Sequence, residues 1–481
     1  MHVPAEPELR TSPPRTTIAL TGLSVALVFC LAVTRVTTPD TFVHLSLGRW
    51  MAEHGQVPSA NLLSFTQPDR PATDHEWLFQ VGLYGVWQTV GLSGATLLKA
   101  GMVAAAFLLA AATARAKGSG VVVACAVMLV AAAAARFRFT LRPQVVAMLL
   151  LAAYLFLFER WRQGKPHGLL LLLPLQVLWA NIHGSAAFGC ALILACAVAE
   201  SLRCFALQSE NRRRLLWLWA VALALIPATM LNPNGVAQLT FPFSHAAAQS
   251  AMGLKELLQD RASIVWSDLA SRHIFFTILA AGGILSLVGC WRRRDITEAG
   301  LLVGLLWASF HSERFIELFA VAAAPIVARG IPGLGLKSPI MAAAGLCLLA
   351  FACIQATAKA LPFGLGVAHG FFPEEEVAWI QHHAPQGNLF NEFEHGGYVS
   401  WTTRRPVFLD SRGMPSYDPA LVRAYVDAWT SRDAWRELLG KYFISVALVE
   451  RRPLKRMFDT SPDWTLAHEG PVFSVYLRKP R

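Results

Sequence analysis

Long apolar runs separated by short polar segments dominate the first three quarters of this 481-residue chain. A helix that crosses a bilayer needs about 20 apolar residues, and these runs approach that length. The runs that predict membrane-spanning helices are 18–34, 94–114, 119–135, 143–158, 167–183, 185–202, 214–230, 273–290, 298–311, 315–328 and 338–356. We therefore expect an all-α polytopic membrane protein with about eleven spans.

Basic residues fall in every second loop between these runs. They are Arg10, Arg15, Arg115, Lys117, Arg160, Arg162, Lys165, Arg203, Arg212, Arg213, Arg214, Arg292, Arg293, Arg294, Arg329 and Lys337. Lys and Arg concentrate in cytoplasmic loops, so the alternation predicts a cytoplasmic N-terminus. An odd number of spans then places residues 357–481 outside. The run at 18–34 is long enough to stay as an anchor rather than to serve as a cleaved signal.

The first outer loop, residues 35–93, contains a further apolar segment that we interpret as an interfacial helix over 74–90. Gly91 and Gly94 predict a turn at its end. If this segment crossed the membrane, the basic clusters downstream would face outside. Thr73 and Glu76 have the Ser/Thr-x-x-Glu spacing of a capping box, which predicts where the helix begins.

The chain after about residue 370 has a different pattern, typical of a small α/β domain. Short apolar segments at 406–410, 442–450 and 471–477 predict strands, and 418–429 predicts an amphipathic helix that starts at an Asp. We therefore divide the chain into a membrane domain, 1–356, which includes the loop 35–93, and an extracytoplasmic domain, 357–481.

The composition agrees with a membrane protein, because 54% of the residues are hydrophobic and only 15% are charged. The net charge of +11 does not indicate a nucleic-acid partner, since the clustered basic residues flank apolar runs and so carry topology information. The eight cysteines also lie in or beside the apolar runs. Their positions predict neither a disulfide framework nor a metal-binding spacing.

The first candidate for chemistry is the start of the outer loop, "TPDTFVHLSLGRW". Pro39 suits the first position of a helix capped by Thr38, and Asp40 and His44 then lie one turn apart. An apolar stripe on the same side is formed by Val43, Leu47, Trp50 and Met51. Ionisable groups on a packed face are costly unless they have partners, which favours a function.

Two interpretations of this pair remain open. Asp40 could act as a general base toward an acceptor hydroxyl, with His44 orienting it or contacting a phosphate. Alternatively, Asp40 is a charge that favours the helix dipole, and His44 is an interfacial residue.

Three arginines, Arg136, Arg138 and Arg142, lie at the predicted outer mouth of the membrane domain, where basic residues are not expected. The guanidinium group forms paired hydrogen bonds to phosphate oxygens. These arginines could hold the phosphate of a lipid-linked donor, or they could bind phospholipid headgroups without specificity.

Three further motifs place polar groups at the ends of predicted spans, where such groups are costly. "WANIHG" contributes Asn181 and His183, "LNPNG" contributes Asn232, and "HSERF" contributes Arg314. Each also has a structural interpretation: a hairpin that satisfies its own backbone, a turn, and an ion pair of Arg314 with Glu313 alone. In the tail, "NEFEHGGY" and "FLDSR" could bind a sugar or peptide, or the glycines of the first motif could simply start a helix.

Taken together, these motifs resemble a branch of the bacterial GT-C-type membrane glycosyltransferases. The resemblance lies in Asp40, His44, Gly48-Arg49-Trp50, Gly55 to Pro58, Ser64-Phe65-Thr66, His75-Glu76-Trp77, Arg142-Pro143, "WANIHG", "NPNG", "GGY" and "FLDSR". It covers most of the chain. One departure is Asn61, which stands where the branch usually has an acid.

The resemblance implies a GT-C-like fold and a bacterial cytoplasmic-membrane enzyme that takes a sugar from a polyprenyl-phosphate carrier at the outer face. It implies Asp40 as the residue that activates a glycan, lipid or protein acceptor, with membrane lipids and no nucleic acid as other partners. Some members use a divalent metal ion, whose ligands the motifs do not identify. Two alternatives remain. A lipid-linked glycan flippase would need charged residues deep in the spans, along a path for its substrate. A noncatalytic envelope-assembly protein would lose nothing on Asp40→Asn.

Overall fold

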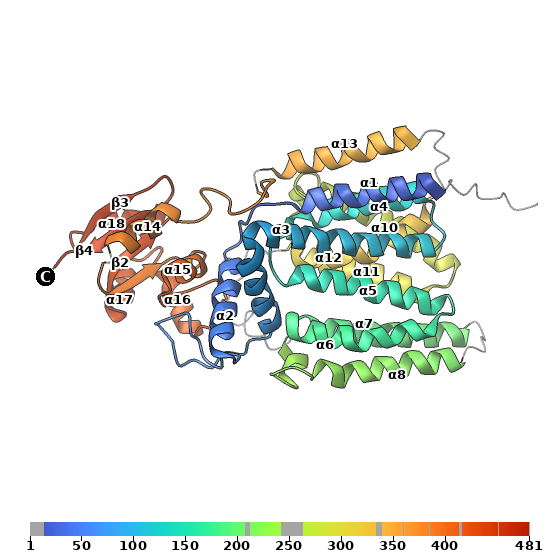
Figure 1. The fold of residues 1–481 in the computed structure, drawn as a ribbon, viewed down its shortest axis with the longest axis horizontal. Helices are drawn as coiled ribbons and strands as arrows, with labels where there is room; N and C mark the ends of the chain where they lie inside the picture. The colour runs from blue at the N-terminus through green and yellow to red at the C-terminus, as the bar shows by residue number, and fades with distance from the viewer. Residues whose placement is uncertain are drawn as a thin grey trace, which may run out of the picture.

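The computed structural model describes residues 14–206, 212–241, 263–332, 339–358, 360–383, 385–412, 416–450 and 452–480. Most of these residues belong to a bundle of helices that lie side by side along one direction (Figure 1). The bundle consists of α1 (Pro14–Ala32), the second half of α3 (Trp77–Ala116), α4 (Val121–Ala135), α5 (Gln144–Arg162), η2 (Pro166–Leu171), α6 (Leu172–Ile182), α7 (Ala186–Ala206), α8 (Arg212–Thr229), α10 (Ile274–Arg292), α11 (Ile296–His311), α12 (Ile316–Gly330) and α13 (Pro339–Thr357).

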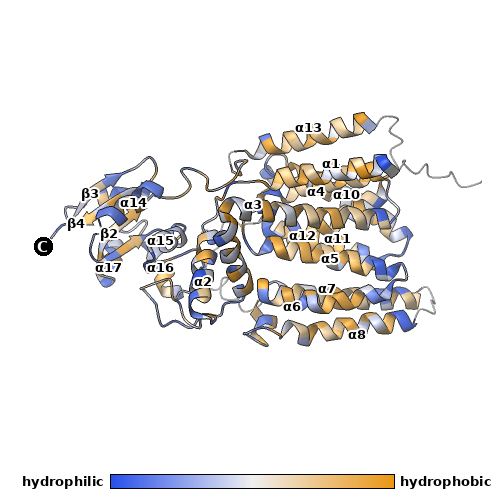
Figure 2. Cartoon of the chain, in the orientation of Figure 1, coloured by the Kyte–Doolittle hydropathy of each residue, from blue (hydrophilic) through white to orange (hydrophobic). Residues whose placement is uncertain are grey.

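Each of the eleven predicted spans coincides with a helical segment of this bundle. Six helices in the described part of the chain are long and apolar enough to cross a membrane, and the described α6, α11 and α13 regions are shorter apolar helices. Figure 2 shows the hydrophobic residues along the bundle helices and hydrophilic residues near their ends. The bundle therefore has the character of a membrane domain, while the count of eleven spans stays a prediction.

Small residues allow the bundle helices to pack closely. Almost every residue of α4 and α12 is buried, and alanine predominates in both. A Cβ atom on Gly282 of α10 would lie 2.9 Å from Cγ1 of Val327 on α12. Close packing of small side chains is a main source of association between helices in a membrane.

Two helices of the first outer loop lie across one end of the bundle (Figure 1). They are α2 (Asp40–His54) and the first half of α3, which ends where Gly91 adopts φ 65° and ψ −172°. The predicted separate helix before Gly91 is therefore confirmed. At Gly48 a Cβ would lie 2.1 Å from the Gln80 carbonyl oxygen, so glycine allows α2 to rest on α3.

Both predicted helix caps in this loop are wrong. Helix α2 begins at Asp40 with Pro39 in the cap position, and no side chain caps it, so Thr38 does not serve as its cap. Helix α3 begins at Trp77 with Glu76 in the cap position, so Thr73 and Glu76 form no capping box. Instead, Asp74 Oδ1 accepts a hydrogen bond from the Glu76 backbone N at 2.9 Å, which leaves the Glu76 side chain available for other contacts.

The tail forms a four-stranded sheet in the order β1-β2-β4-β3. The strands are β1 (Asn388–Asn391), β2 (Ile444–Val449), β3 (Trp464–Glu469) and β4 (Ser474–Arg478), and only the β1–β2 pair is parallel. The accompanying helices are α14 (Glu374–His383), α15 (Gly396–Thr403), α16 (Pro419–Asp427), α17 (Arg432–Lys441) and α18 (Arg452–Asp459). Separate apolar clusters, one around Phe390 and Phe458 and another around Val377 and Val475, form its core.

Three of the four elements predicted in the tail are confirmed as β2, β4 and α16, and Asp418 caps α16 by accepting from Ala420 N at 2.8 Å. The predicted strand at 406–410 is wrong. Val407 instead forms a single bridge with Ser64 of the first outer loop, so this apolar segment is buried between loop and tail rather than in the sheet. The tail also touches α2 directly, since a Cβ on Gly397 would lie 2.9 Å from the Pro39 carbonyl oxygen.

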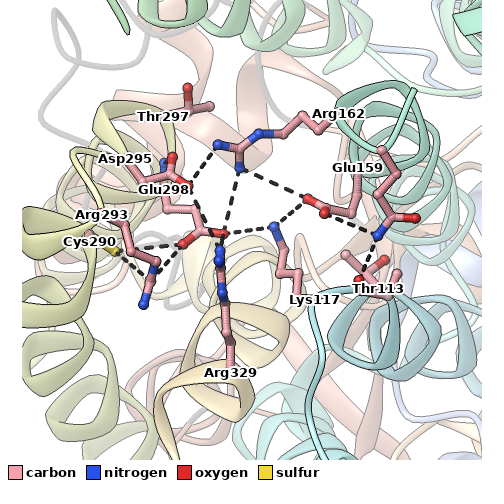
Figure 3. A network of polar contacts seen from close by, with 12 residues as sticks. Thr113, Lys117, Glu159, Arg162, Cys290, Arg293, Asp295, Thr297, Glu298 and Arg329 are labelled. Atoms are coloured by element: carbon pink, nitrogen blue, oxygen red, sulfur yellow. Dashed lines mark hydrogen bonds and ion pairs between the residues drawn. The ribbon is translucent and has the colours of Figure 1, made fainter. Parts of the chain in front are cut away.

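A network of ion pairs joins several bundle helices (Figure 3). Its residues lie near the ends of α3, α5, α10 and α12 and the start of α11, at the bundle end away from α2 (Figure 1). Glu298 of α11 lies 2.7 Å from Lys117 Nζ, 3.1 Å from Arg293 Nη2 and 3.3 Å from Arg329 Nη1. Arg162 of α5 is 2.7 Å from Asp295 Oδ2. It also reaches Glu200 of α7 at 3.2 Å, and Glu159 accepts from Lys117 at 2.5 Å. Several basic residues from the predicted inner loops are therefore paired with acids of neighbouring helices.

Candidate functional site

Asp40 lies where the bundle, the first outer loop and the tail meet. Its Oδ2 atom is 2.9 Å from Nη2 of Arg142, which comes from the segment before α5. Its Oδ1 atom accepts a hydrogen bond from the hydroxyl of Ser411 in the tail. The two oxygens of this carboxylate are thus held by groups 102 and 371 positions away in the chain.

His44, one turn further along α2, faces Glu76 rather than pairing directly with Asp40. Its Nδ1 atom is 3.9 Å from Glu76 Oε2. Glu76 Oε1 lies 3.7 Å from His75 Nε2 and 3.8 Å from His183 Nε2. The predicted residues His44 and His183, which are far apart in the sequence, therefore surround one carboxyl group.

Burial controls the protonation of this group. It raises the pKa of Glu76 to about 8, with the Asp74 and Asp40 charges adding to the effect, while the Arg142 charge opposes it. It lowers the pKa values of His44 and His75 to about 4. At neutral pH these two imidazoles are neutral and offer lone pairs next to a protonated carboxyl group.

The motifs around 181 and 232 hold the turn that carries Glu76. Asn181 Oδ1 accepts from the Trp77 indole at 2.8 Å, and Asn234 Nδ2 donates to the Asp74 carbonyl oxygen at 2.9 Å. Asn232 supports Asn234 by accepting from its backbone N at 2.7 Å. Asn181 and Asn232 therefore help to hold the turn that precedes α3.

Gly184 has a packing reason of its own. A Cβ atom there would lie 2.7 Å from Phe241 Cε1 and 2.9 Å from His75 Cδ2. Glycine at position 184 thus lets the imidazole of His75 pack closely against the segment after α6. Any side chain at this position would displace the residue next to Glu76.

The three predicted arginines have different environments. Arg142 contacts Asp40, and Arg138 Nε lies 3.4 Å from Glu317 Oε2. Arg136 is fully buried and donates to the backbone carbonyl oxygens of Leu31 and Leu361 at 3.1 and 3.4 Å. Its guanidinium therefore links the end of α1 to the segment that follows α13.

Arg314 belongs with Arg138 and Arg142. Burial lowers the pKa of His183 well below its ordinary value, and after His75 the charges of Arg142, Arg138 and Arg314 lower it further. The charges of all three guanidinium groups therefore disfavour protonation of the same imidazole. The prediction that Glu313 pairs with Arg314 alone is wrong, because Glu313 Oε2 lies 2.9 Å from Arg272 Nη2.

The tail segment that carries Ser411 is fixed by a buried ion pair. Arg412 donates to both oxygens of Asp410, from Nε at 2.8 Å and from Nη2 at 2.7 Å. The Tyr417 hydroxyl also donates to Asp410 Oδ2 at 2.7 Å. Burial alone would raise the pKa of Asp410, but the Arg412 charge and these hydrogen bonds outweigh it and hold the pKa below its ordinary value.

Asn61, where the resemblance leads us to expect an acid, belongs to this tail contact. Its amide oxygen accepts from Arg412, and its Nδ2 donates to the Ser416 carbonyl oxygen at 3.0 Å. Arg412 already has Asp410 as its counter-charge, so a neutral amide completes its hydrogen bonds without adding a second buried negative charge. Asn61 thus joins the first outer loop to the tail.

Two groups of side chains have the donor types of a metal site. One is Glu76 with its three histidines. The other, in the tail, is Glu394, His395 and Glu450, the single group in the described residues with three donor atoms all within 4.8 Å of one another. In that group His395 Nε2 already lies 2.8 Å from Glu450 Oε2.

Solved structures with the same fold are oligosaccharyltransferases of Archaeoglobus fulgidus. The apo enzyme has a TM-score of 0.62 at 12% identity, over 90% of this chain and 69% of that one. The AglB complex with an inhibitory peptide and a dolichol-phosphate gives 0.61 at 11%, over 90% and 69%. The complex with Zn and sulfate gives 0.57 at 14%, over 90% and 67%. No family model and no curated protein sequence matches the chain.

At these identities the likeness establishes the fold. The chain shares the fold of these solved structures, with a helical bundle and a smaller α/β unit at one end (Figure 1). Glu76, Asp74 and Ser411 also lie at this candidate site, and our sequence reasoning did not name any of them individually as a candidate. The string "TDHEW" carried a signal in its clustered acids and histidine, but we interpreted it as a helix start.

Proposed function

We propose that this protein is a membrane glycosyltransferase that moves a sugar from a polyprenyl-phosphate carrier to an acceptor at the outer face of a bacterial cytoplasmic membrane. The observation that carries the proposal is the Asp40 carboxylate beside Arg142, at the bundle end where α2 and the tail meet. The fold adds support, since the similar oligosaccharyltransferases were solved with a dolichol-phosphate and with a tethered acceptor peptide.

In this proposal Asp40 is the general base. It takes the proton of the acceptor as the acceptor attacks the sugar, a role that typically accelerates a reaction by about 10²–10⁴. Arg138, Arg142 and Arg314 bind the donor phosphate, and their charges offset the negative charge that develops as the carrier departs. Arg142 thus has two partners in turn: Asp40 before the donor arrives, and the phosphate afterwards.

A divalent metal ion fits the Glu76 group by its chemistry. His44 Nδ1 is buried without a hydrogen-bond partner. A cation close to Glu76 would lower its raised pKa and so favour the ionised carboxylate. The donor atoms for the ion would be the Glu76 oxygens and the imidazole nitrogens of His44 and His183, which lie 3.9 and 3.8 Å from them. When bound, it would act as a Lewis acid toward phosphate oxygens.

The orientation follows from the charge pattern. The N-terminal end of α1 lies at the bundle end that carries the ion-pair network, and the Asp40 site lies at the other end. The positive-inside rule makes the network end cytoplasmic, which places Asp40 and the tail outside. Reporter fusions after Arg481 should report the outside and fusions near Arg293 the cytoplasm. A cytoplasmic C-terminus would contradict this orientation.

The central experiment follows turnover of polyprenyl-phosphate-linked sugar in a lipid extract by purified protein. Asp40→Asn keeps the shape of the side chain but cannot accept a proton, so turnover should fall by about 10²–10⁴ while donor binding and thermal stability stay near wild type. Asp69→Asn, at an exposed position of the same loop, is the matched control and should stay fully active. Full turnover by Asp40→Asn, or its failure to fold, would remove Asp40 from the catalytic role.

A further inference from the structure

Lys99 is a buried cation of the bundle that the proposed mechanism does not use. It belongs to the second half of α3, and only 2% of it is exposed. A charged group inside a membrane domain is costly, so it almost always has a partner or a function there. Within the described residues Lys99 has no carboxylate partner, because the three hydrogen bonds of its ammonium go to oxygen atoms of Thr34 and Phe139.

The position of these oxygens explains how the charge is stabilised without an acid. Lys99 Nζ donates to Thr34 Oγ1 at 2.8 Å, to the Phe139 carbonyl oxygen at 2.9 Å and to the Thr34 carbonyl oxygen at 3.3 Å. Thr34 follows the end of α1, and Phe139 follows the end of η1 (Arg136–Arg138). Carbonyl oxygens at the C-terminal end of a helix lack partners inside the helix and favour a nearby cation. Thr34 Oγ1 also donates to the Phe139 carbonyl oxygen, at 3.2 Å.

The two segments that Lys99 joins lead directly into the candidate site. The first runs from Thr34 to Asp40, where α2 begins, and the second runs from Phe139 to Arg142, just before α5. Between these helices neither segment is helical or part of the four-stranded sheet. Their shape therefore depends on hydrogen bonds to groups elsewhere in the fold, and Lys99 supplies several of these.

A further contact joins the same two segments beside the reacting groups. Thr41 Oγ1 donates to the Leu141 carbonyl oxygen at 3.1 Å. These residues are the sequence neighbours of Asp40 and Arg142, whose side chains meet with Oδ2 and Nη2 2.9 Å apart. The junction at Lys99 holds the segments together further upstream in each. The contact between carboxylate and guanidinium thus forms between two segments that are fixed to each other at two places.

We propose that Lys99 is a positioning residue for the reaction, which sets where Asp40 lies relative to Arg142. This inference rests on the proposed function and adds to it a residue that acts only through other residues. Without the ammonium, the oxygens of Thr34 and Phe139 lose their shared donor. The two segments can then shift, and the carboxylate and the guanidinium leave the separation that the reaction requires.

The experiment measures turnover of polyprenyl phosphate carrying a radiolabelled hexose by the purified full-length protein in a lipid extract. Lys99→Met keeps an unbranched side chain and removes the charge. Its kcat should fall by about 10- to 100-fold, since a misplacement of about 1 Å can cost about 10²-fold in rate. Thr34→Val keeps the ammonium but removes one of its acceptors, so kcat should fall by a smaller factor. The control is Thr96→Val, one turn before Lys99 on α3, because the buried Thr96 hydroxyl has no hydrogen-bond partner among the described residues. Its kcat should equal that of wild type.

A second background separates positioning from folding. In Asp40→Asn no base remains to be positioned, so adding Lys99→Met should lower the residual turnover by a much smaller factor than it does in wild type. A residue that only stabilises the fold would lower turnover by the same factor in both backgrounds. If Lys99→Met does not fold, Thr34→Val takes its place in the same comparison.

The results that would overturn the inference differ from those that would overturn the proposed function. Equal factors in the two backgrounds would make Lys99 a purely structural residue. Wild-type kcat in both Lys99→Met and Thr34→Val would also remove its positioning role, and in either case a loss of turnover in Asp40→Asn would leave the proposed function intact. Absence of turnover by the wild-type protein would defeat the proposed function, and the positioning role with it.

Discussion

Replacement of Asp410 by Asn should destabilise the protein strongly, although the side chain keeps its shape. Asp410 is fully buried and forms a bidentate ion pair with Arg412. Removing one member of a buried pair leaves the other charge uncompensated, at a cost of about 3–5 kcal/mol. Asn61 would still accept from Arg412, which places the expected loss of unfolding free energy near the lower end, at about 3 kcal/mol.

The measurement is scanning calorimetry of the purified protein in detergent. Domains of 150–250 residues lose about 2–4 °C of Tm per kcal/mol, so Asp410→Asn should lower Tm by about 6–12 °C. Asp427→Asn, at an exposed position of the same tail, should leave Tm unchanged. The double variant Asp410→Asn with Arg412→Gln should recover part of the loss, because it removes the uncompensated charge as well.

The pH dependence gives a second, independent check. The pKa of Asp410 is lower in the folded protein than in the unfolded chain, so its contribution is present above the unfolded value of about 4. That contribution disappears as the pH falls through the folded pKa. The difference in Tm between wild type and Asp410→Asn should therefore be constant at pH 5–8 and shrink in stronger acid. An Asp410→Asn protein that melts within about 1 °C of wild type would refute the reasoning.

Three further predictions concern the site and the bundle. Arg142→Gln should weaken donor binding in a lipid-binding assay with little effect on Tm. Arg142→Lys should restore only part of the donor affinity, because an ammonium lacks the guanidinium fork. Equal donor binding by wild type and both variants would leave Arg142 no donor role. Added Zn²⁺ at pH 7 should release about one proton from wild type and none from Glu76→Gln, since the pKa of Glu76 is about 8 and metal binding requires the carboxylate. Calorimetry in buffers of different ionisation enthalpy measures this proton release. Equal proton release by the two proteins would exclude Glu76 as a ligand. Glu298→Gln should cost about 3–5 kcal/mol of stability with unchanged turnover per folded molecule, and an unchanged Tm would contradict the importance of its buried pairs.

The helices could be predicted from the sequence because their determinants are local. Each apolar run contains its own hydrophobic signal, and Gly91 marks the end of the transverse helix by a backbone geometry that glycine readily adopts. The strand predicted at 406–410 failed for the opposite reason. Its hydrophobicity reflects burial, but its backbone partner is Ser64, some 340 residues away, and no local pattern reveals such a partner.

The candidate site could be predicted only in part. Asp40, His44, Arg142 and His183 stood out because polar groups at the ends of spans are costly, and the structure brings them near one another. The motif "FLDSR" was selected, but the contact of its Ser411 with Asp40 could not be predicted, because it depends on how the tail lies on α2. Arg136 and Arg138, the arginines predicted beside Arg142 at the outer mouth, look alike in sequence. They have different partners in the structure, because those partners depend on packing.

The ion-pair network has a consequence for how the protein is made. Lys117 and Glu298 are 181 positions apart, so at about 5–20 residues per second a ribosome needs roughly 10 to 40 s to supply this partner of a lysine already synthesised. Until then Lys117 has Glu159 as an acidic partner, and Arg162 has Glu159 and Glu200. The network is therefore completed in stages, as the acids of later helices are made. A chain truncated before α11 would keep the earlier pairs and lose those with Asp295 and Glu298.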